Sequence, residues 1–252
     1  MKVSIIIPTF NRSDLLADCL KATEETIDIN NDEIIVIDSK LLSLSFSQAC
    51  NQGARQAKGE YLVFLNDDTI PQDNWLDELV RIADKRQDVG IVGSKLLIPK
   101  DRTIQHAGVV CSANKTHYHI YRGCPEDFPA ANKQREYKVV TGACLLIRKE
   151  LFNAVGGFDE RFINGMEDID LCLKVDALNK RIIYNPKSVV LHYEGQSENR
   201  EDNTGFNSRL LKQIWGKKIM SDDMFWLRQD NLTVTGWEGE SSNMIYKELV
   251  CQ

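Results

Sequence analysis

Residues 59–69 read Gly-Glu-Tyr-Leu-Val-Phe-Leu-Asn-Asp-Asp-Thr, and this stretch decides the fold of the chain. Residues 61–65 are apolar or aromatic without alternation, which is typical of a central strand covered on both faces. The strand then ends in Asp67 and Asp68, at the position where open α/β sheets bind their ligands. Adjacent carboxylates repel one another and are costly to bury, so a divalent cation is one natural partner. An acidic turn that caps a helix after Pro71 is the other interpretation.

The composition is that of an ordinary globular protein, with 252 residues, 42% hydrophobic and 27% charged. A net charge of −6 without a basic block argues against nucleic-acid binding. The seven cysteines are scattered and form no Cys-x-x-Cys pair, so neither a zinc knuckle nor a disulfide framework is indicated. We find no signal peptide, and no apolar run approaches the roughly 20 residues that span a bilayer. We therefore expect a cytoplasmic protein with at most peripheral membrane contact.

The first third of the chain alternates between strand and helix patterns, which predicts a Rossmann-like α/β half. Right-handed crossovers would place Thr9, Asp38, Asp67 and Asp68 along one edge of the sheet. No Gly-x-Gly-x-x-Gly or Walker lysine loop follows the first strand, which argues against a dinucleotide or P-loop site. The predicted elements are strands over residues 2–8, 33–37 and 59–65, the first two of them buried, and helices over 14–26 and 46–57.

The second part of the chain continues the alternation of helices and strands. Apolar spacing predicts a helix over residues 71–85 and a buried strand over 89–98. A further buried strand over 139–147 is interrupted by Gly142, and such a glycine often marks the close approach of a ligand. The remaining predictions are a turn and strand over 101–110, a short helix over 149–155, paired short strands over 181–186 and 188–192, and a helix over 206–215.

Residues 111–137 are irregular, polar and aromatic, and we expect a mobile loop there. His117 and His119 alternate around Tyr118, so they share a face and could hold a metal ion; the other interpretation is that both are plain surface residues.

Three acids, Glu167, Asp168 and Asp170, stand at the start of an apolar helical segment. A helix dipole favours acids in the first turn, which is the simple explanation. Three acids in four residues exceed what capping needs, so this cluster is also a candidate for chemistry.

The chain carries a set of motifs in a fixed order. They are Ile5-Ile6-Ile7-Pro8-Thr9-Phe10-Asn11-Arg12, Ile37-Asp38, Ala57-Lys58-Gly59-Glu60-Tyr61, Asn66-Asp67-Asp68, Thr141-Gly142-Ala143-Cys144, Gly156-Gly157-Phe158-Asp159-Glu160, Glu167-Asp168-Ile169-Asp170-Leu171-Cys172 and His192. Taken together, these motifs resemble a family 2 glycosyltransferase, and the resemblance covers about residues 1–195, with the motifs at the right intervals. The segment 101–110 and the tail around Trp215 resemble the bacterial subgroup that acts on O-antigen, capsule or other surface polysaccharides.

The resemblance implies the GT-A fold, an α/β architecture with a mixed central sheet and helices on both faces. A Rossmann-like nucleotide-sugar-binding half would span residues 1–98, and an acceptor-side, catalytic half would span 99–195. We expect residues 196–252 to form a helical extension packed on the same domain.

The resemblance also implies a role for each matching residue. Asp168 matches the catalytic base, while Asp68 and His192 match the residues that complete a Mn²⁺ or Mg²⁺ site on the donor diphosphate. The residues implied in binding the nucleotide-sugar are Pro8, Thr9, Phe10, Arg12, Asp38, Asn66, Asp67, Gly142, Ala143 and Glu167.

The implied reaction is an inverting, single displacement, which needs one carboxylate base and no enzyme nucleophile. The expected partners are a nucleotide-diphospho-sugar donor, of the UDP- or dTDP-type, and a glycan or lipid-linked saccharide acceptor. The segment Ser39-Lys40-Leu41 departs from the usual glycine- or serine-rich turn, which leaves the nucleobase open. The Gln-x-x-Arg-Trp motif of processive synthases is missing, so we expect one sugar per encounter.

Two alternatives remain from the sequence. The chain could be a nucleotide-sugar-binding protein that has lost catalysis, although it retains Asp68, Asp168 and His192 together. It could also be a sugar nucleotidyltransferase, but the glycine-rich, arginine-containing loop of those enzymes is absent after the first strand.

Overall fold

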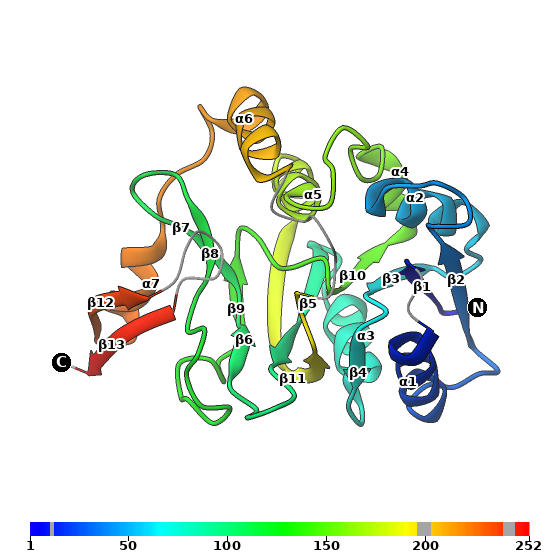
Figure 1. The fold of residues 1–252 in the computed structure, drawn as a ribbon, viewed down its shortest axis with the longest axis horizontal. Helices are drawn as coiled ribbons and strands as arrows, with labels where there is room; N and C mark the ends of the chain where they lie inside the picture. The colour runs from blue at the N-terminus through cyan, green and yellow to red at the C-terminus, as the bar shows by residue number, and fades with distance from the viewer. Residues whose placement is uncertain (11–12, 196–202, 239–244, 252) are drawn as a thin grey trace.

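The computed structural model describes residues 1–10, 13–195, 203–238 and 245–251. Helices and strands alternate along the chain and build a mixed α/β architecture (Figure 1). The helices are α1 (Ser13–Glu25), α2 (Phe46–Gln56), α3 (Trp75–Lys85), α4 (Lys149–Ala154), α5 (Glu167–Asp176), α6 (Thr204–Trp215) and α7 (Asp223–Gln229). The strands are β1 (Val3–Thr9), β2 (Asp32–Asp38), β3 (Tyr61–Leu65), β4 (Thr69–Pro71), β5 (Val89–Leu97), β6 (Ile104–His106), β7 (Val109–Cys111), β8 (His117–His119), β9 (Arg135–Tyr137), β10 (Cys144–Arg148), β11 (Arg181–His192), β12 (Leu232–Glu238) and β13 (Ile245–Cys251).

The central sheet has the order β2-β1-β3-β10-β5-β11-β4, with β6 and β9 at its side. Strand β1 pairs in parallel with both β2 and β3, whereas β10 runs antiparallel between β3 and β5. The residues of β3 are fully buried, as the unbroken apolar run predicted. Because β1, β2 and β3 run the same way, their carboxyl ends lie together at one edge of the sheet.

Helices cover both faces of this sheet, as expected. The core on one face includes Cys19 of α1 and Trp75 of α3. The core on the other face includes Cys50 of α2 and Leu171 of α5. Helix α2 packs especially close, since a Cβ at Gly53 would come within 2.4 Å of the Ile6 side chain.

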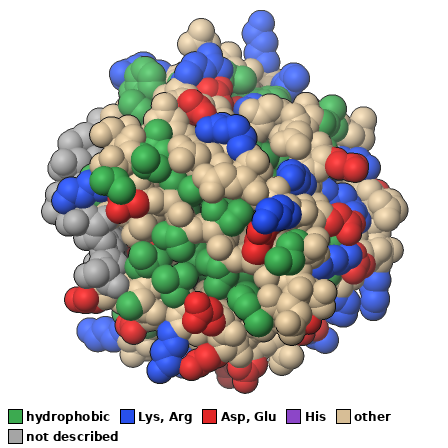
Figure 2. Space-filling model, turned by 90° about the vertical axis from the view of Figure 1, so that its right-hand side faces the viewer, with side chains coloured by type: hydrophobic (Ala, Val, Ile, Leu, Met, Phe, Trp, Pro, Cys, Tyr) green, Lys and Arg blue, Asp and Glu red, His purple; other side chains and the backbone are tan. Residues whose placement is uncertain are grey.

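Strand β2 differs from the prediction of a buried strand, because it forms the edge of the sheet and is only partly buried. Its Val36 side chain is 40% exposed, and Leu41 and Leu42 are also exposed just after the strand. Figure 2 views the molecule from the side on which β2 lies and shows apolar side chains gathered in the middle of that face. An apolar run alone does not distinguish a central strand from an edge strand.

Several boundaries in the second part of the chain also differ from the predictions. The helix expected over residues 71–85 begins only at Trp75, because residues 69–71 form β4 and pair with β11. The strand expected over 139–147 is regular only from Cys144, since the backbone before it turns away toward α5. The two paired strands expected over 181–192 are one strand, β11, with a bulge at Pro186 where proline cannot donate to the ladder.

Residues 111–137 are irregular over 112–116 and 120–134, as predicted, but the segment also includes parts of three short strands, and its mobility stays a prediction. Strands β7 and β8 pair as a hairpin, and β9 pairs with β11. Tyr118, Ile120 and Tyr121 are buried in the main core. Their burial explains the aromatic content of this segment.

Helices α6 and α7 lie after residue 203, and Leu211, Trp215 and Leu227 of this part of the chain are buried in the main core. This part is not helical throughout, because β12 and β13 form an antiparallel hairpin near the end of the chain (Figure 1). Residues 232–235 read Leu-Thr-Val-Thr, and β-branched residues favour a strand. The proposed limits of the two halves stay a prediction.

Candidate active site

A cavity of about 570 Å³ opens where β1, β2 and β3 end, and residues from both parts of the chain line it. Strand β1 brings one wall, the turn after β3 another, and the start of α5 a third. The expected site residues that line this cavity are Pro8, Thr9, Phe10, Asn66, Asp67, Asp68, Gly142, Ala143, Glu167, Asp168 and His192.

Two of the expected donor-binding residues are not placed in the cavity wall. Asp38 lies opposite Thr9 in the register of β1 and β2, but its Oδ1 accepts from the backbone N–H of Leu41 over 2.8 Å. The cavity is lined instead by Ser39, the residue after Asp38. Arg12 lies outside the described residues, so its role stays a prediction.

The turn after β3 is held tightly by its own hydrogen bonds. The Asn66 N–H donates to the Ala143 carbonyl over 3.0 Å, and the Thr69 hydroxyl donates to the Asn66 carbonyl over 2.7 Å. Asp67 and Asp68 are consequently fixed at the cavity and are only 8% and 5% exposed. The acidic turn is thus a rigid part of the site rather than a helix cap, because α3 begins further along the chain.

Two neutral polar groups beside this turn have an unused hydrogen-bonding capacity. Thr9 Oγ1 and Asn66 Oδ1 are buried without a hydrogen-bond partner among the described residues. Buried polar atoms are almost always satisfied in folded proteins. Their placement in the cavity wall therefore points to a polar ligand.

Asp68 and His192 come from distant parts of the sequence and meet in the cavity. Strand β11 pairs with β4 so that His192 lies opposite Thr69, and His192 Nε2 stands 3.0 Å from Asp68 Oδ1. A carboxylate and an imidazole are both ligands that Mn²⁺ accepts. In the described part of the chain, no three His, Cys, Asp or Glu side chains gather closely enough for a complete metal site. The pair fits a cation that takes its remaining ligands from a diphosphate and water, as Mg²⁺ does at nucleotide sites.

Asp168 is positioned by the first turn of α5. Its Oδ2 accepts from the Gly142 N–H and its Oδ1 from the Ile169 N–H, each over 2.8 Å. Two N–H donors and the positive end of the helix dipole stabilise the ionised carboxylate. Asp168 is partly exposed to the cavity, so this carboxylate can accept a proton from a bound molecule.

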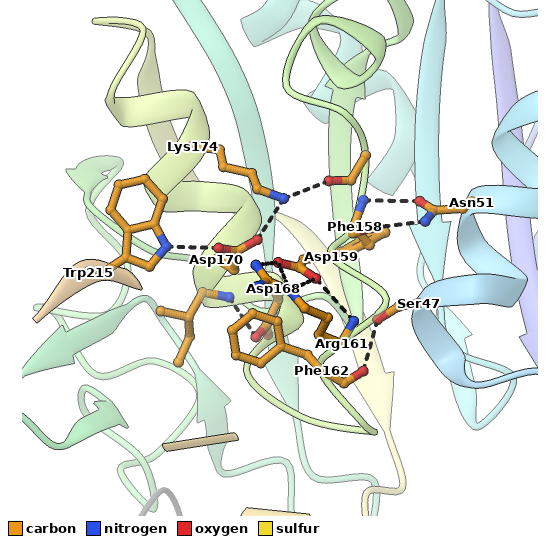
Figure 3. Close-up of polar contacts among 12 residues, drawn as sticks. Ser47, Asn51, Phe158, Asp159, Arg161, Phe162, Asp168, Asp170, Lys174 and Trp215 are labelled. Atoms are coloured by element: carbon orange, nitrogen blue, oxygen red, sulfur yellow. Dashed lines mark hydrogen bonds and ion pairs between the residues drawn. The ribbon is translucent and has the colours of Figure 1, made fainter. Parts of the chain in front are cut away.

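The other two acids of this cluster hold the site together. Glu167 Oε2 accepts from the Gly165 N–H over 2.6 Å, which closes the turn before α5. Asp170 is fully buried, and its carboxylate binds Trp215 Nε1 and Lys174 Nζ, each over 2.8 Å (Figure 3). The three acids at this helix start therefore serve two purposes. Asp168 faces the cavity, and Asp170 forms buried contacts in the core.

The loop that precedes α5 is fastened on two sides. Asn51 of α2 exchanges hydrogen bonds with the backbone of Phe158, over 2.9 and 3.0 Å (Figure 3). Asn207 of α6 makes the same exchange with Ile163, over 2.8 and 3.1 Å. The position of Asp168 thus depends on helices from both ends of the chain.

The structure adds cavity residues that the sequence did not single out, among them Gln105, Asn164 and Glu194. His119 also lines the cavity, and its Nδ1 stands 2.8 Å from Nδ1 of His106. Complete burial lowers the pKa of His106 well below its usual range, so this ring is neutral. The histidines could have been noticed in the sequence as candidate site residues. A single glutamine such as Gln105 gives no indication in the sequence that it lines a site.

The structure bears on both interpretations of His117 and His119. Both residues are half-buried rather than plain surface residues, and desolvation, together with the nearby Lys115, lowers the pKa of His117 to about 4. His119 lines the cavity beside His106, and a metal role for it stays a prediction.

Comparison with known proteins identifies the family of the chain. The family described as glycosyltransferase like family 2 matches residues 23–214. The chain belongs to this glycosyltransferase family. The expectation drawn from the sequence motifs is therefore confirmed.

Curated relatives of this glycosyltransferase chain include an O-antigen biosynthesis protein and a rhamnosyltransferase. The O-antigen biosynthesis protein RfbC of Myxococcus xanthus is 33% identical over 225 residues, covering 78% of this chain. An N-acetylglucosaminyl-diphospho-decaprenol L-rhamnosyltransferase of Mycobacterium tuberculosis is 40% identical over 62 residues, covering 25% of this chain. The chain spans only 18% of the first relative's length and 20% of the second's.

Solved structures confirm the GT-A fold of this glycosyltransferase chain. A structure of GalNAc-T7 with UDP, GalNAc and Mn²⁺ matches with a TM-score of 0.65 at 17% identity, covering 86% of this chain and 49% of the other. The mannosyltransferase PcManGT of Pyrobaculum calidifontis, with GDP-Man and Mn²⁺, matches with a TM-score of 0.60 at 15% identity, covering 90% and 68%. Among the described residues of the chain, no helix is long and apolar enough to cross a membrane.

Proposed function

We propose that this chain is an inverting, metal-dependent glycosyltransferase that moves one sugar per encounter from a nucleotide-diphospho-sugar to a hydroxyl of its acceptor. The observation that carries the proposal is the placement of Asp168 and of the Asp68–His192 pair in one cavity. A displacement of this kind needs a base for the acceptor and charge stabilisation for the leaving group.

Asp168 acts as the general base in this proposal. It takes the proton from the acceptor hydroxyl while the oxygen of that hydroxyl forms a bond to the anomeric carbon. The bond from that carbon to the diphosphate oxygen breaks in the same step, so the configuration inverts. The two N–H groups that bind Asp168 hold it ionised and fix its direction, which lowers the cost of orienting the base.

Asp68 and His192 would hold the divalent cation. When bound, Mn²⁺ or Mg²⁺ would supply positive charge to stabilise the nucleoside diphosphate as a leaving group. Asp67, Thr9 and Asn66 line the same wall and bind the nucleotide and the ribose side of the donor. Gly142 and Ala143, on the other side of the cavity, lie beside the donor sugar.

The substrates follow from the polysaccharide-related relatives. We infer a UDP- or dTDP-sugar as donor and a glycan or lipid-linked saccharide as acceptor, in polysaccharide biosynthesis at the cytoplasmic side. GalNAc-T7 was solved with UDP and PcManGT with GDP-Man, so GDP-sugars belong in the test.

A panel of nucleotide-sugars, each with and without Mn²⁺, tests this proposal. The expected result is thermal stabilisation by one donor class only when Mn²⁺ is present, together with slow donor hydrolysis and transfer to a saccharide acceptor. Donor binding without hydrolysis or transfer supports an inactive binding protein. Release of pyrophosphate from a nucleoside triphosphate and a sugar phosphate supports a nucleotidyltransferase.

A further inference from the structure

Gln105 is buried behind His192 and contacts it through both ends of its amide. It is 2% exposed, and its Oε1 lies 2.7 Å from His192 Nδ1. Its Nε2 lies 3.3 Å from the His192 carbonyl and 3.1 Å from Glu194 Oε2. Both of these oxygens can only accept, so they fix the amide with its nitrogen toward them. The Gln105 oxygen is therefore the group that faces the ring.

An ion pair stabilises this orientation of the amide. Glu194 is bound by Arg122, whose Nη2 lies 2.6 Å from Glu194 Oε2. The Arg122 side chain is only 8% exposed, so the pair is largely shielded from water. Because the carboxylate is held in place, Gln105 cannot turn its oxygen toward Glu194 without a repulsive contact.

The fixed amide decides which nitrogen of His192 carries the proton. The Gln105 oxygen can only accept, so His192 Nδ1 must donate. A neutral imidazole has one N–H, which leaves Nε2 with a lone pair. That nitrogen stands 3.0 Å from Asp68 Oδ1 and 3.4 Å from Asn66 Nδ2. A lone pair and a carboxylate oxygen that converge in this way suit a divalent cation.

We propose that Gln105 is a positioning residue that holds His192 in the tautomer with a proton on Nδ1, so that Nε2 can bind the divalent cation of the donor diphosphate. This inference rests on the proposed function, because it assumes that the cation binds between Asp68 and His192. In water, a neutral imidazole favours the opposite tautomer, so the protein has to impose this one. Outer hydrogen bonds of this kind orient metal-binding histidines and make them better ligands.

Imidazole ¹⁵N spectra of the wild-type protein without metal give the first test. The chain has only four histidines, so the His192 signals are assigned by comparison with His192→Gln. Above the pH at which the ring signals stop moving, we expect Nδ1 of His192 to carry the proton and Nε2 to be bare. A proton on Nε2 in that spectrum overturns the proposal without any variant of Gln105.

Variants of Gln105 give the second test, with Mn²⁺ binding in the presence of UDP measured by electron paramagnetic resonance. We expect Gln105→Leu to move the proton to Nε2 and to weaken Mn²⁺ binding about 10- to 100-fold. Gln105→Glu combined with Glu194→Gln keeps an acceptor on Nδ1 without placing two carboxylates 3.1 Å apart, so this double variant should keep the tautomer and most of the affinity. Gln72→Leu is the matched control. The Gln72 side chain donates a hydrogen bond to the Ile70 carbonyl, and Gln72 does not line the cavity.

The outcomes separate this inference from the proposed function. If wild-type protein binds Mn²⁺ with UDP and Gln105→Leu binds it equally well, the positioning role is wrong while the proposed function stands. If wild-type protein binds no Mn²⁺ with any nucleoside diphosphate, the proposed metal site is wrong and the inference falls with it. If Gln105→Leu does not fold, the wild-type spectrum and the double variant Gln105→Glu with Glu194→Gln still decide, since loss of the Nδ1 proton in either contradicts the proposal.

Discussion

The backbone N–H of Gly142 donates a hydrogen bond to Asp168 Oδ2 over 2.8 Å, which joins the approach to β10 with the first turn of α5. The contact is close enough that a Cβ at position 142 would stand 3.1 Å from the Asp168 Cβ. The two residues are 26 positions apart, and the absent side chain at Gly142 is what lets this backbone donor reach the carboxylate.

Gly142→Ala should therefore displace Asp168 and slow the reaction. We expect kcat to fall by up to about 10-fold, because Asp168 must move by a few tenths of an ångström and a misplacement of about 1 Å at a reacting group costs about 100-fold. Steady-state kinetics measure the change, with the donor that the nucleotide-sugar panel identifies. Gly205→Ala on α6 is the control, since its Cβ would meet only the Arg209 side chain at 3.7 Å. An unchanged kcat for Gly142→Ala would show that the close contact does not matter.

Trp215→Phe should destabilise the fold by removing the N–H that binds the buried Asp170 carboxylate. The loss of one hydrogen bond to a buried charge predicts a decrease of about 1–3 kcal/mol in the free energy of unfolding. Urea unfolding measures this. In an Asp170→Asn background, the same substitution should cost less, since the charge is gone. Equal costs in both backgrounds would mean that the tryptophan acts through packing alone.

Removal of the metal should weaken donor binding. We expect calorimetric binding of UDP to weaken at least about 10-fold with EDTA, which removes the cation, and in Asp68→Asn, which removes one of the two side chains that would hold it. Asp73→Asn, at an exposed acid outside the cavity, should bind as the wild type does. Binding that is indifferent to EDTA contradicts the metal role of Asp68.

The half-buried His117 predicts a pH dependence of stability. Its pKa is about 4 in the folded chain and about 6.5 when unfolded, so the unfolded state binds the extra proton between these values. The contribution of this ring is present above pH 6.5 and is lost as the pH falls toward 4. His117→Asn should make the free energy of unfolding less dependent on pH in this window, by up to about 1.4 kcal/mol per pH unit. If the free energies of unfolding of the wild type and His117→Asn changed equally with pH in this window, the prediction would be contradicted.

Much of the fold follows from local patterns in the sequence. The buried run before Asp67 and the alternation of strands and helices predicted the α/β arrangement of the first part of the chain. The elements that differ were decided by pairing across long distances. Strand β2 is an edge strand because β3 pairs with the other side of β1. Strand β11 pairs with β5 on both sides of Pro186, so the proline lies in a register shift inside one strand and does not divide it into two. No local pattern reports which strand lies next to which.

The residues of the candidate site were likewise only partly predictable from the sequence. Acids and histidines are visible in a sequence, so Asp68, Asp168 and His192 could be proposed before the structure placed them in one cavity. A neutral amide such as Gln105 gives no such signal, because its importance lies in the two groups it contacts. Asp170 was visible as an acid, but only the position of Trp215 explains why it is buried.

Asp168→Asn gives the most direct test of the central claim, that this carboxylate is the base of an inverting sugar transfer. The measurement is the rate of transfer at saturating donor and Mn²⁺, with donor affinity measured on the same protein. We predict a loss of at least about 100-fold in kcat with unchanged donor affinity, because an amide cannot accept the proton. Transfer at the wild-type rate with normal donor binding would contradict the account.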